Sequence, residues 1–325
     1  MTLPFRKYQG LGNDFILLDG RTGTLPSFAG EPAQQLCDRH FGIGADGLIL
    51  ALPPQAGGDV RMQIFNADGS EAEMCGNGIR CFARFLADLD AAPVGKSWQV
   101  ETAAGRIVPQ LLEGDLVSVD MGRPFLEPAA IPTSIAAGNP LADQELEVAG
   151  ERLWVAAVGM GNPHAVVQVL DLEQLDFERL GPALEQHPAF PARANVHFVQ
   201  VIAADRLRLR VWERGAGPTL ACGTGACASL VATHLRGACG REASLELPGG
   251  PLQIRWDDND HLQMAGPAVH VFSGVLADNS EASAGASDAG YQQALALLDN
   301  LSLDQMVNLA NNSLEERNRR RISGR

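Results

Sequence analysis

Residues 66–81 read NADGSEAEMCGNGIRC, and this stretch decides how the chain is organised. An apolar run at 60–65 precedes it, and apolar residues at helical spacing follow it over 79–89. Cys75 therefore falls where a loop becomes the N-terminus of a helix. The first N–H groups of a helix have no partner within the helix, so they favour an anion there. That anion is either a bound carboxylate or a thiolate on Cys75, whose pKa we expect to fall below about 8.5.

Taken alone, the motif leaves a second interpretation open. Free cysteine is usually a buried, inert residue, and glycines commonly make turns. A repeat in the sequence argues against this second interpretation. Cys222-Gly-Thr-Gly225 has the same pattern and also precedes a helical run, at 226–235.

Two Gly-x-Gly-Asn turns lie upstream of the two cysteines, at residues 10–13 and 159–162. The spacing from turn to cysteine is 75 − 13 = 62 residues in the first case and 222 − 162 = 60 in the second. Asn66 and Glu213 each lie nine residues before their cysteine. Two matches in the same order, at nearly the same separation, indicate two homologous halves that each contribute one cysteine.

The remaining pattern predicts many short strands and few helices. We expect strands over 3–9, 14–19, 48–52, 60–65, 97–102, 105–112, 115–121, 153–158, 165–169, 195–202, 207–212, 243–247, 251–256, 261–265 and 268–276. We expect helices over 32–40, 79–89, 173–186 and 226–235. Many connections are too short for helical crossovers, so the sheets should be largely antiparallel.

These elements predict an α+β fold with two pseudo-symmetric domains, each a curved, mainly antiparallel β-sheet or barrel around one central helix. We place the first domain at 1–121 and the second at 122–267. The composition of 277–290 is typical of a flexible linker, and two short helices should complete a C-terminal tail over 277–325. We expect this tail to be dispensable for catalysis.

Composition excludes several classes of function. The 325-residue chain carries a net charge of −14, which argues against a nucleic-acid partner. No stretch approaches the roughly 20 apolar residues of a membrane span, and the N-terminus has no apolar signal core, so we expect a cytoplasmic protein. The six cysteines form no CxxC pair, which argues against a zinc ribbon or a thioredoxin-like motif.

Two thiols on matched helix N-termini suggest a cleft at a pseudo-twofold axis. A carbon centre bound there would have one sulfur on each face, so one thiolate could remove a proton while the opposite thiol returns one. The helix N-termini could hold the carboxylate of a small-molecule substrate. Nothing in the sequence suggests a pyridoxal phosphate lysine or a metal cluster, so we expect no cofactor and no metal.

The chain resembles the diaminopimelate epimerases. The motifs that carry the resemblance are Gly-Leu-Gly-Asn-Asp-Phe (10–15), Phe-Asn-Ala-Asp-Gly-Ser-Glu (65–71), Cys-Gly-Asn-Gly-Ile-Arg-Cys (75–81), Gly-Asn-Pro-His (161–164), Glu-Arg-Gly-Ala-Gly (213–217) and Ala-Cys-Gly-Thr-Gly-Ala-Cys (221–227). The resemblance spans about 1–276. The resemblance implies interconversion of LL- and meso-diaminopimelate in lysine and cell-wall precursor synthesis. It also implies that the last strand, about 268–276, belongs to the first domain.

The resemblance also implies roles for individual residues. Cys75 and Cys222 match the two catalytic bases. The positions that match substrate contacts are Asn13, Asn66, Gly76, Asn77, Asn162, Asn195, Glu213, Arg214, Gly223 and Thr224, with His164 and Glu213 also in supporting roles near the reacting centre. Two positions depart from the family pattern, since Pro218 stands where an acid is common and Gly47 where some members have glutamine. A homodimer is the expected assembly, although the sequence does not fix the oligomeric state.

Alternatives remain at this point. A proline racemase-like enzyme has the same architecture, but that family usually has histidine where this chain has Asn77. A thiol redox or metal-binding protein is the alternative from another class. Asn13 and Asn162 could serve only the turns, and His164 could be structural. The glycine-rich turn at 42–47 lacks the spacing of a nucleotide-binding loop, so we do not interpret it as one.

Overall fold

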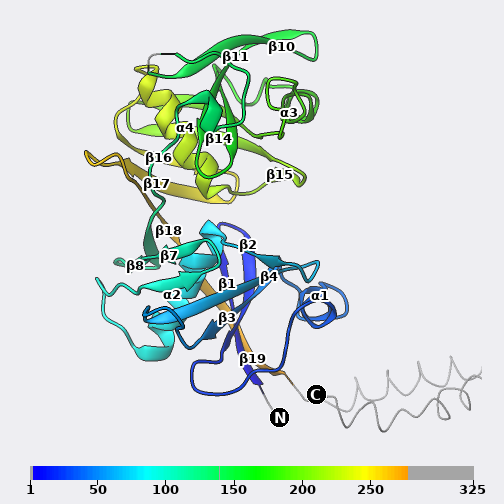
Figure 1. The fold of residues 1–325 in the computed structure, drawn as a ribbon, viewed down its shortest axis with the longest axis vertical. Coiled ribbons are helices and arrows are strands. Elements are labelled where there is room, and N and C mark those ends of the chain that lie inside the picture. Colours follow the sequence, from blue (N-terminus) through cyan, green and yellow to red (C-terminus); the bar gives the residue numbers. More distant parts are fainter. Residues whose placement is uncertain (1–2, 139, 277–325) are drawn as a thin grey trace, which may run out of the picture. The chain divides into compact units, whose positions relative to one another are not determined.

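The computed structural model describes residues 3–138 and 140–276, and the predicted tail at 277–325 lies outside the described residues. Contacts divide the chain into a large unit, Pro4–Gly274, and a second unit made of the two chain ends. The large unit contains two sheets, which Figure 1 shows with their helices.

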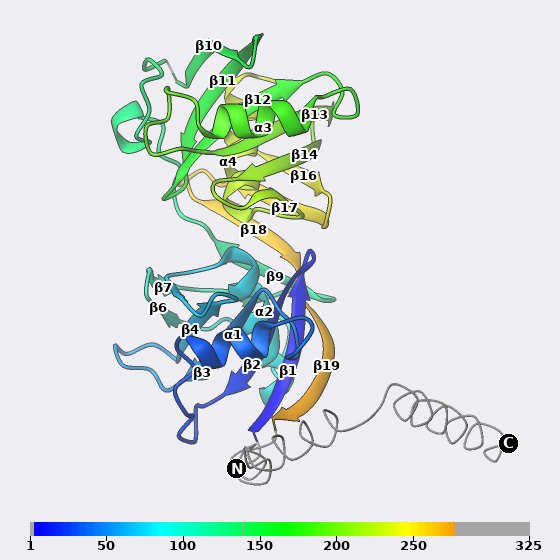
Figure 2. The ribbon, with the colours of Figure 1, turned by 90° about the vertical axis from the view of Figure 1, so that its right-hand side faces the viewer.

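The first sheet has the strand order β19-β1-β2-β3-β4-β6-β7, with β5 paired to β4. Its strands are β1 (Leu3–Gly10), β2 (Asn13–Asp19), β3 (Gly47–Leu52), β4 (Val60–Asn66), β5 (Glu71–Ala72), β6 (Val100–Thr102), β7 (Gly105–Ile107) and β19 (Val269–Leu276). Figure 2 shows β19, the last strand of the described chain, beside β1.

The second sheet has the order β10-β11-β12-β13-β14-β16-β17-β18-β9-β8, with β15 paired to β14. Its strands are β8 (Gln110–Leu111), β9 (Leu116–Asp120), β10 (Ala142–Val148), β11 (Glu151–Gly159), β12 (Pro163–Val169), β13 (Asn195–Ala203), β14 (Arg206–Glu213), β15 (Gly217–Thr219), β16 (Glu242–Leu247), β17 (Gly250–Trp256) and β18 (Leu262–Pro267).

The two sheets repeat one pairing scheme. In the first, β1 and β2 are antiparallel, β2 and β3 parallel, β3 and β4 antiparallel, and β4 and β6 parallel. In the second, β11, β12, β13, β14 and β16 follow the same sequence of orientations. This agreement confirms the two homologous halves that the repeated motifs predicted, with Asn66 and Glu213 as the last residues of β4 and β14.

The helices also correspond, and they explain the parallel pairs. α1 (Glu31–Cys37) connects β2 to β3, and α3 (Phe177–Glu185) connects β12 to β13. α2 (Gly76–Asp90) and α4 (Gly223–Leu235) make the other two crossovers and are largely buried within their halves. Antiparallel pairs predominate as predicted, but each helical crossover returns the chain to a parallel neighbour, so both sheets are mixed.

The fold class is the predicted one, with small differences in the elements. The expectation of a single strand over 105–112 was wrong, because β7 and β8 divide it between the two sheets. The sequence also gave no sign of β10, where polar and charged residues interrupt the apolar alternation. The division into domains at residues 121 and 267 stays a prediction. Among the described residues, no helix is both long and apolar enough to cross a membrane.

Candidate active site

The two motif cysteines line one cavity of about 900 Å³. Cys75 is the N-cap residue of α2, with φ −140° and ψ 123°, and Cys222 is the N-cap residue of α4, with φ −134° and ψ 111°. Both residues have the extended backbone that an N-cap requires, so both helices direct their free N–H groups toward the same space. The structure thus brings together two positions that are 147 residues apart in the sequence (222 − 75).

Most of the predicted site residues line this cavity. Those that do are Asn13, Asn66, Cys75, Gly76, Asn77, Asn162, Glu213, Cys222, Gly223 and Thr224. Asn195, Arg214 and His164 are not among its lining residues. The side chain of Asn195 is buried and accepts a hydrogen bond from the Arg214 backbone N–H at 3.0 Å, while His164 is fully buried behind Asn162.

Cys75 is partly exposed and has two neighbours in its own half. Its Sγ accepts a hydrogen bond from the Gly78 N–H at 3.4 Å, which closes the first turn of α2. The same Sγ lies 3.7 Å from Asn13 Oδ1, toward which the thiol can donate. Cys75 therefore acts as a helix cap and also faces a carbonyl oxygen.

Cys222 has different surroundings. Its Sγ lies 3.6 Å from Thr224 Oγ1, and its side chain makes no capping hydrogen bond to α4. Glu213 also lies near this thiol, and Thr219 Oγ1 donates to Glu213 Oε1 at 2.5 Å. Burial raises the pKa of the Glu213 carboxyl.

The pKa values of the two thiols differ in direction from the expectation based on the helix N-termini. Burial raises the pKa of Cys75, against the lowering effect of the Gly78 and Asn77 N–H groups and of Arg80. Burial and the nearby Glu213 raise the pKa of Cys222. Loss of hydration disfavours a thiolate more than the helix N-terminus favours it, so the thiol form of both cysteines is favoured.

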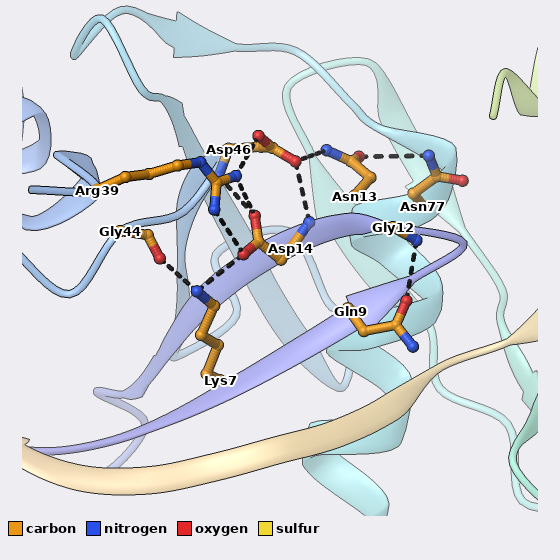
Figure 3. Close-up of polar contacts among 9 residues, drawn as sticks. All are labelled: Lys7, Gln9, Gly12, Asn13, Asp14, Arg39, Gly44, Asp46 and Asn77. Atoms are coloured by element: carbon orange, nitrogen blue, oxygen red, sulfur yellow. Dashed lines mark hydrogen bonds and ion pairs between the residues drawn. The ribbon is translucent and has the colours of Figure 1, made fainter. Parts of the chain in front are cut away.

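A polar network holds Asn13, as Figure 3 shows. Asn13 Nδ2 donates to Asp46 Oδ2 at 2.8 Å. Arg39 bridges two carboxylates, with Nη2 at 2.7 Å from both Asp46 Oδ1 and Asp14 Oδ1. Lys7 Nζ lies 2.8 Å from Asp14 Oδ2 and also donates to the Gly44 carbonyl. These cations hold the pKa of Asp14 at about 2, although its burial acts in the opposite direction.

A second network reaches Asn13 from within α2. Arg80 is fully buried and donates through Nη2 to Asn77 Oδ1 at 3.0 Å, and through Nη1 to the Gly76 carbonyl at 3.2 Å. Asn77 Nδ2 in turn donates to Asn13 Oδ1 at 3.2 Å. Arg80 therefore fixes the start of α2 and places a positive charge beneath the cavity.

The matching asparagine of the second half is held by two histidines. Asn162 Oδ1 lies 2.7 Å from His164 Nε2, and His164 Nδ1 lies 2.8 Å from His197 Nε2. His197 Nδ1 is buried and has no hydrogen-bond partner within the described part of the chain. An unpaired buried donor costs more than an unpaired lone pair on an imidazole, so His197 carries its proton on Nε2 and His164 on its own Nε2. Burial lowers the pKa of both rings, to about 3 for His197.

The sequence analysis gave no role to several residues of these networks, among them Lys7, Arg39, Asp46, Arg80 and His197. Asp46 lies in the glycine-rich turn at 42–47, where its place among glycines was the available signal. Arg80 lies within the first cysteine motif, but nothing in the motif indicated that its side chain would contact Asn77. His197 had no sequence signal, because its contact depends on the parallel register of β12 and β13, which pairs His164 with Asn195.

No group of three or more His, Cys, Asp or Glu side chains within residues 3–138 and 140–276 is arranged to hold a metal ion. All six cysteines are free.

Solved structures with low sequence identity share the fold. A phenazine biosynthesis protein of the PhzF family from Bacillus anthracis has a TM-score of 0.60 at 17% identity, over 85% of this chain and 99% of that one. A hydroxyproline epimerase from Agrobacterium vitis has a TM-score of 0.58 at 16% identity, over 86% of this chain and 93% of that one. The architecture is therefore that of the class of two-half, mixed-sheet proteins to which these belong.

Sequence comparison is more specific. The profile named diaminopimelate epimerase matches residues 5–126 and 156–271. The diaminopimelate epimerase of Prochlorococcus marinus (strain MIT 9313) is 57% identical over 280 residues, covering 84% of this chain and 92% of that protein. That of Acaryochloris marina (strain MBIC 11017) is 55% identical over 279 residues, covering 85% and 99%. The chain belongs to the diaminopimelate epimerase family.

Proposed function

We propose that the chain epimerises LL-diaminopimelate to meso-diaminopimelate by a two-base thiol mechanism that needs no cofactor. The observation that carries the proposal is the cavity itself, which is lined by Cys75 and Cys222, each the N-cap residue of a buried helix. A Cα held between the two sulfurs can lose its proton to one sulfur when that sulfur is a thiolate, and gain a proton from the thiol on the other face. The centre is then inverted, and the protonation states of the two sulfurs are exchanged.

Backbone amides of both helices support the carboxylate next to that centre. The N–H groups of Gly76 and Asn77 on α2, and those of Gly223 and Thr224 on α4, lie in the first turns, where N–H groups have no intrahelical partner. They stabilise the carboxylate and the additional negative charge that develops on it when the Cα proton leaves. Asn66 and Asn162 supply further polar contacts in the cavity, and Asn195 holds the backbone of Arg214, which follows the lining residue Glu213 in sequence.

The raised thiol pKa values suit this chemistry. A Cα–H is a very weak acid, and a thiolate whose conjugate acid has a high pKa is a correspondingly stronger base. The Glu213 carboxylate, whose conjugate acid has a pKa raised by burial, lies near the Cys222 thiol and can accept its proton, which generates the thiolate that the reaction needs. In this scheme Cys75 and Cys222 exchange roles when the direction of the reaction is reversed.

Incubation with LL-diaminopimelate in deuterated water tests the proposal. We expect deuterium to enter one Cα while the LL isomer converts to the meso isomer, and we expect no exchange with L-proline under the same conditions. Exchange and racemisation of proline would instead support the proline racemase-like alternative. No exchange with either substrate, in protein whose thiols are shown to be reduced, would contradict the proposal.

We also propose the setting in which the enzyme works. It serves lysine and peptidoglycan precursor synthesis in the cytoplasm, without a nucleic-acid or membrane partner, which agrees with its net charge of −14. The domains divide near residue 121, with β19 returned to the first domain beside β1.

A homodimer is the proposed assembly. Within the part of the chain that the structure describes, β19 is an edge strand of the first sheet, and it exposes Val271 and Phe272. An edge strand with exposed apolar side chains favours association with a second copy. Light scattering on the purified chain, with Phe272→Glu as the comparison, should give a dimer for the unmodified protein and a shift toward monomer for the variant.

A further inference from the structure

The orientation of the Asn13 amide follows from the charges at the two ends of its hydrogen-bond chain. Asp46 lies between Arg39 and Asn13 and its ionised carboxylate can only accept hydrogen bonds. Arg80, at the other end, can only donate, and it donates to Asn77 Oδ1 at 3.0 Å. The two amides between these ends therefore have one arrangement that satisfies every contact.

In that arrangement Asn13 turns its NH₂ group to Asp46 and its carbonyl oxygen to α2. Asn13 Nδ2 donates to Asp46 Oδ2 at 2.8 Å, and Asn13 Oδ1 accepts from Asn77 Nδ2 at 3.2 Å (Figure 3). Rotation of the Asn13 amide by 180° would place its oxygen against the Asp46 carboxylate and its NH₂ group against that of Asn77. Both contacts would then be repulsive.

The fixed carbonyl oxygen also faces the thiol. Cys75 Sγ lies 3.7 Å from Asn13 Oδ1, a distance at which S–H can donate to it. A carbonyl oxygen stabilises the thiol through this contact and repels a thiolate in the same place. The orientation of Asn13 therefore affects the protonation of Cys75.

We propose that Asp46, held by Arg39, is a positioning residue that orients the Asn13 amide and thereby keeps Cys75 as a thiol in the enzyme without substrate. Asp46 does not reach the sulfur in this scheme, and it acts through the one amide that separates them. This inference rests on the proposed catalytic role of Cys75 for its functional meaning, but its test does not depend on epimerase activity.

Other groups face Cys75 and must be considered with Asn13. The Gly78 and Asn77 N–H groups and the Arg80 guanidinium favour a thiolate, whereas Glu213, from β14 in the second half, disfavours it. None of these groups makes a hydrogen bond to Asp46 within the described part of the chain. An amide at position 46 has one oxygen for the two side-chain donors that Asp46 now accepts from, Arg39 and Asn13. With that oxygen toward Arg39, its NH₂ group would face the NH₂ group of Asn13 and oppose the orientation that Asn77 and Arg80 favour.

Alkylation by iodoacetamide, followed by mass spectrometry, measures the result at each cysteine separately. We expect Asp46→Asn to increase the rate at Cys75 roughly threefold at pH 7, because a tenfold larger thiolate fraction is partly offset by lower nucleophilicity. The rate at Cys222 in the same sample is the internal control and should not change. An unchanged rate at Cys75 in folded Asp46→Asn protein would overturn the proposal.

A double-mutant cycle separates amide orientation from simple loss of a negative charge. Asn13→Ala removes the carbonyl oxygen and should itself increase alkylation of Cys75. Asp46→Asn should add nothing in that background if Asp46 acts through Asn13. A full threefold increase from Asp46→Asn in the Asn13→Ala protein would assign the effect to charge and overturn the proposal.

Arg39→Gln is the matched control, and it keeps the proposal falsifiable if Asp46→Asn does not fold. This variant leaves the Asp46 carboxylate, and hence the Asn13 orientation, in place. We expect an unchanged or lower rate at Cys75, since the unpaired carboxylate disfavours a thiolate. An increase equal to that of Asp46→Asn or Asn13→Ala would show that a loosened 39–46 segment, and not amide orientation, controls the thiol, and this would overturn the proposal.

Discussion

The two helix N-termini of the site have nearly the same backbone but different side-chain surroundings. Cys75 and Cys222 differ by only 6° in φ (140 − 134) and 12° in ψ (123 − 111). Yet Cys75 is partly exposed and caps its helix, whereas Cys222 is 6% exposed and contacts Thr224. The two halves thus share the backbone conformation that positions each sulfur, but the side chains around the two sulfurs differ.

The two matched asparagines show the same contrast. Charged groups hold Asn13, through Asp46 and Arg39, so that its oxygen faces α2. Two neutral histidines hold Asn162, with its oxygen used by His164. One half therefore holds its asparagine through charged groups and the other through neutral imidazoles, so the pseudo-symmetric site is chemically asymmetric.

Serine replacement at either motif cysteine should have the largest effect. Cys75→Ser and Cys222→Ser should each lower kcat by about 10²–10⁴-fold, since a hydroxyl is a far weaker acid and base at this centre. Activity measured with LL-diaminopimelate and, separately, with the meso isomer checks both directions. Near-normal turnover in either variant would contradict a role for one sulfur on each face.

Cys81→Ser and Cys227→Ser are the controls for that comparison. Both cysteines are fully buried inside α2 and α4, away from the residues that line the cavity. A hydroxyl buried in these apolar positions should lower the free energy of unfolding by roughly 1–3 kcal/mol and leave kcat largely unchanged. Thermal unfolding and the activity assay, run side by side, distinguish the two pairs.

Sequence predicted the parts of the site that the repeat makes visible. The turns, the strand ends at Asn66 and Glu213 and the two helix N-termini all recur at matched spacing, so the halves could be aligned without a structure. The sign of the thiol pKa shift could not be predicted, because it depends on burial by residues from other elements. The contact of His197 with His164 depends on strand register, which the sequence does not state.

Replacing the second glycine of each Cys-Gly-x-Gly motif with alanine should lower the free energy of unfolding more in the second half than in the first. A Cβ at Gly225 would lie 2.0 Å from the Cε1 atom of the buried His197 ring, so the ring or α4 must move. We expect Gly225→Ala to cost about 1–3 kcal/mol. A Cβ at Gly78 would meet its nearest neighbours at 3.3 Å, and alanine also favours the helix, so Gly78→Ala should stay within about 1 kcal/mol. Equal losses in chemical denaturation would contradict this contrast.

The buried histidine pair of the second half should make the free energy of unfolding depend on pH. This dependence should begin at a higher pH than that of Asp14 in the first half. His164 and His197 have folded-state pKa values below 6.5, so the unfolded chain binds more protons as the pH falls below about 6.5. Stability is then lost with falling pH, by about 1.4 kcal/mol per unit for each histidine, down to about pH 3 for His197.

Asp14 gives the matching behaviour in the first half, at lower pH. Its folded-state pKa is lowered from 3.8 to about 2, so its stabilising effect is present above 3.8 and is lost only between these values.

Denaturation of the unmodified protein and of His197→Gln between pH 5 and 6.5 should show a shallower slope for the variant. Parallel slopes would mean that His197 is protonated in the folded protein.

The smallest expected effect is that of Arg39→Lys, which tests how the first half holds Asn13. The Arg39 side chain is 53% exposed, and it bridges Asp14 and Asp46 through one guanidinium. Lysine keeps the charge but cannot reach two carboxylates with the same geometry. Because exposed ion pairs contribute little, and Lys7 still pairs with Asp14, the free energy of unfolding should fall by less than about 1 kcal/mol. A larger loss, measured by denaturation at low and high salt, would show that the charged network of the first half stabilises the fold in addition to orienting Asn13.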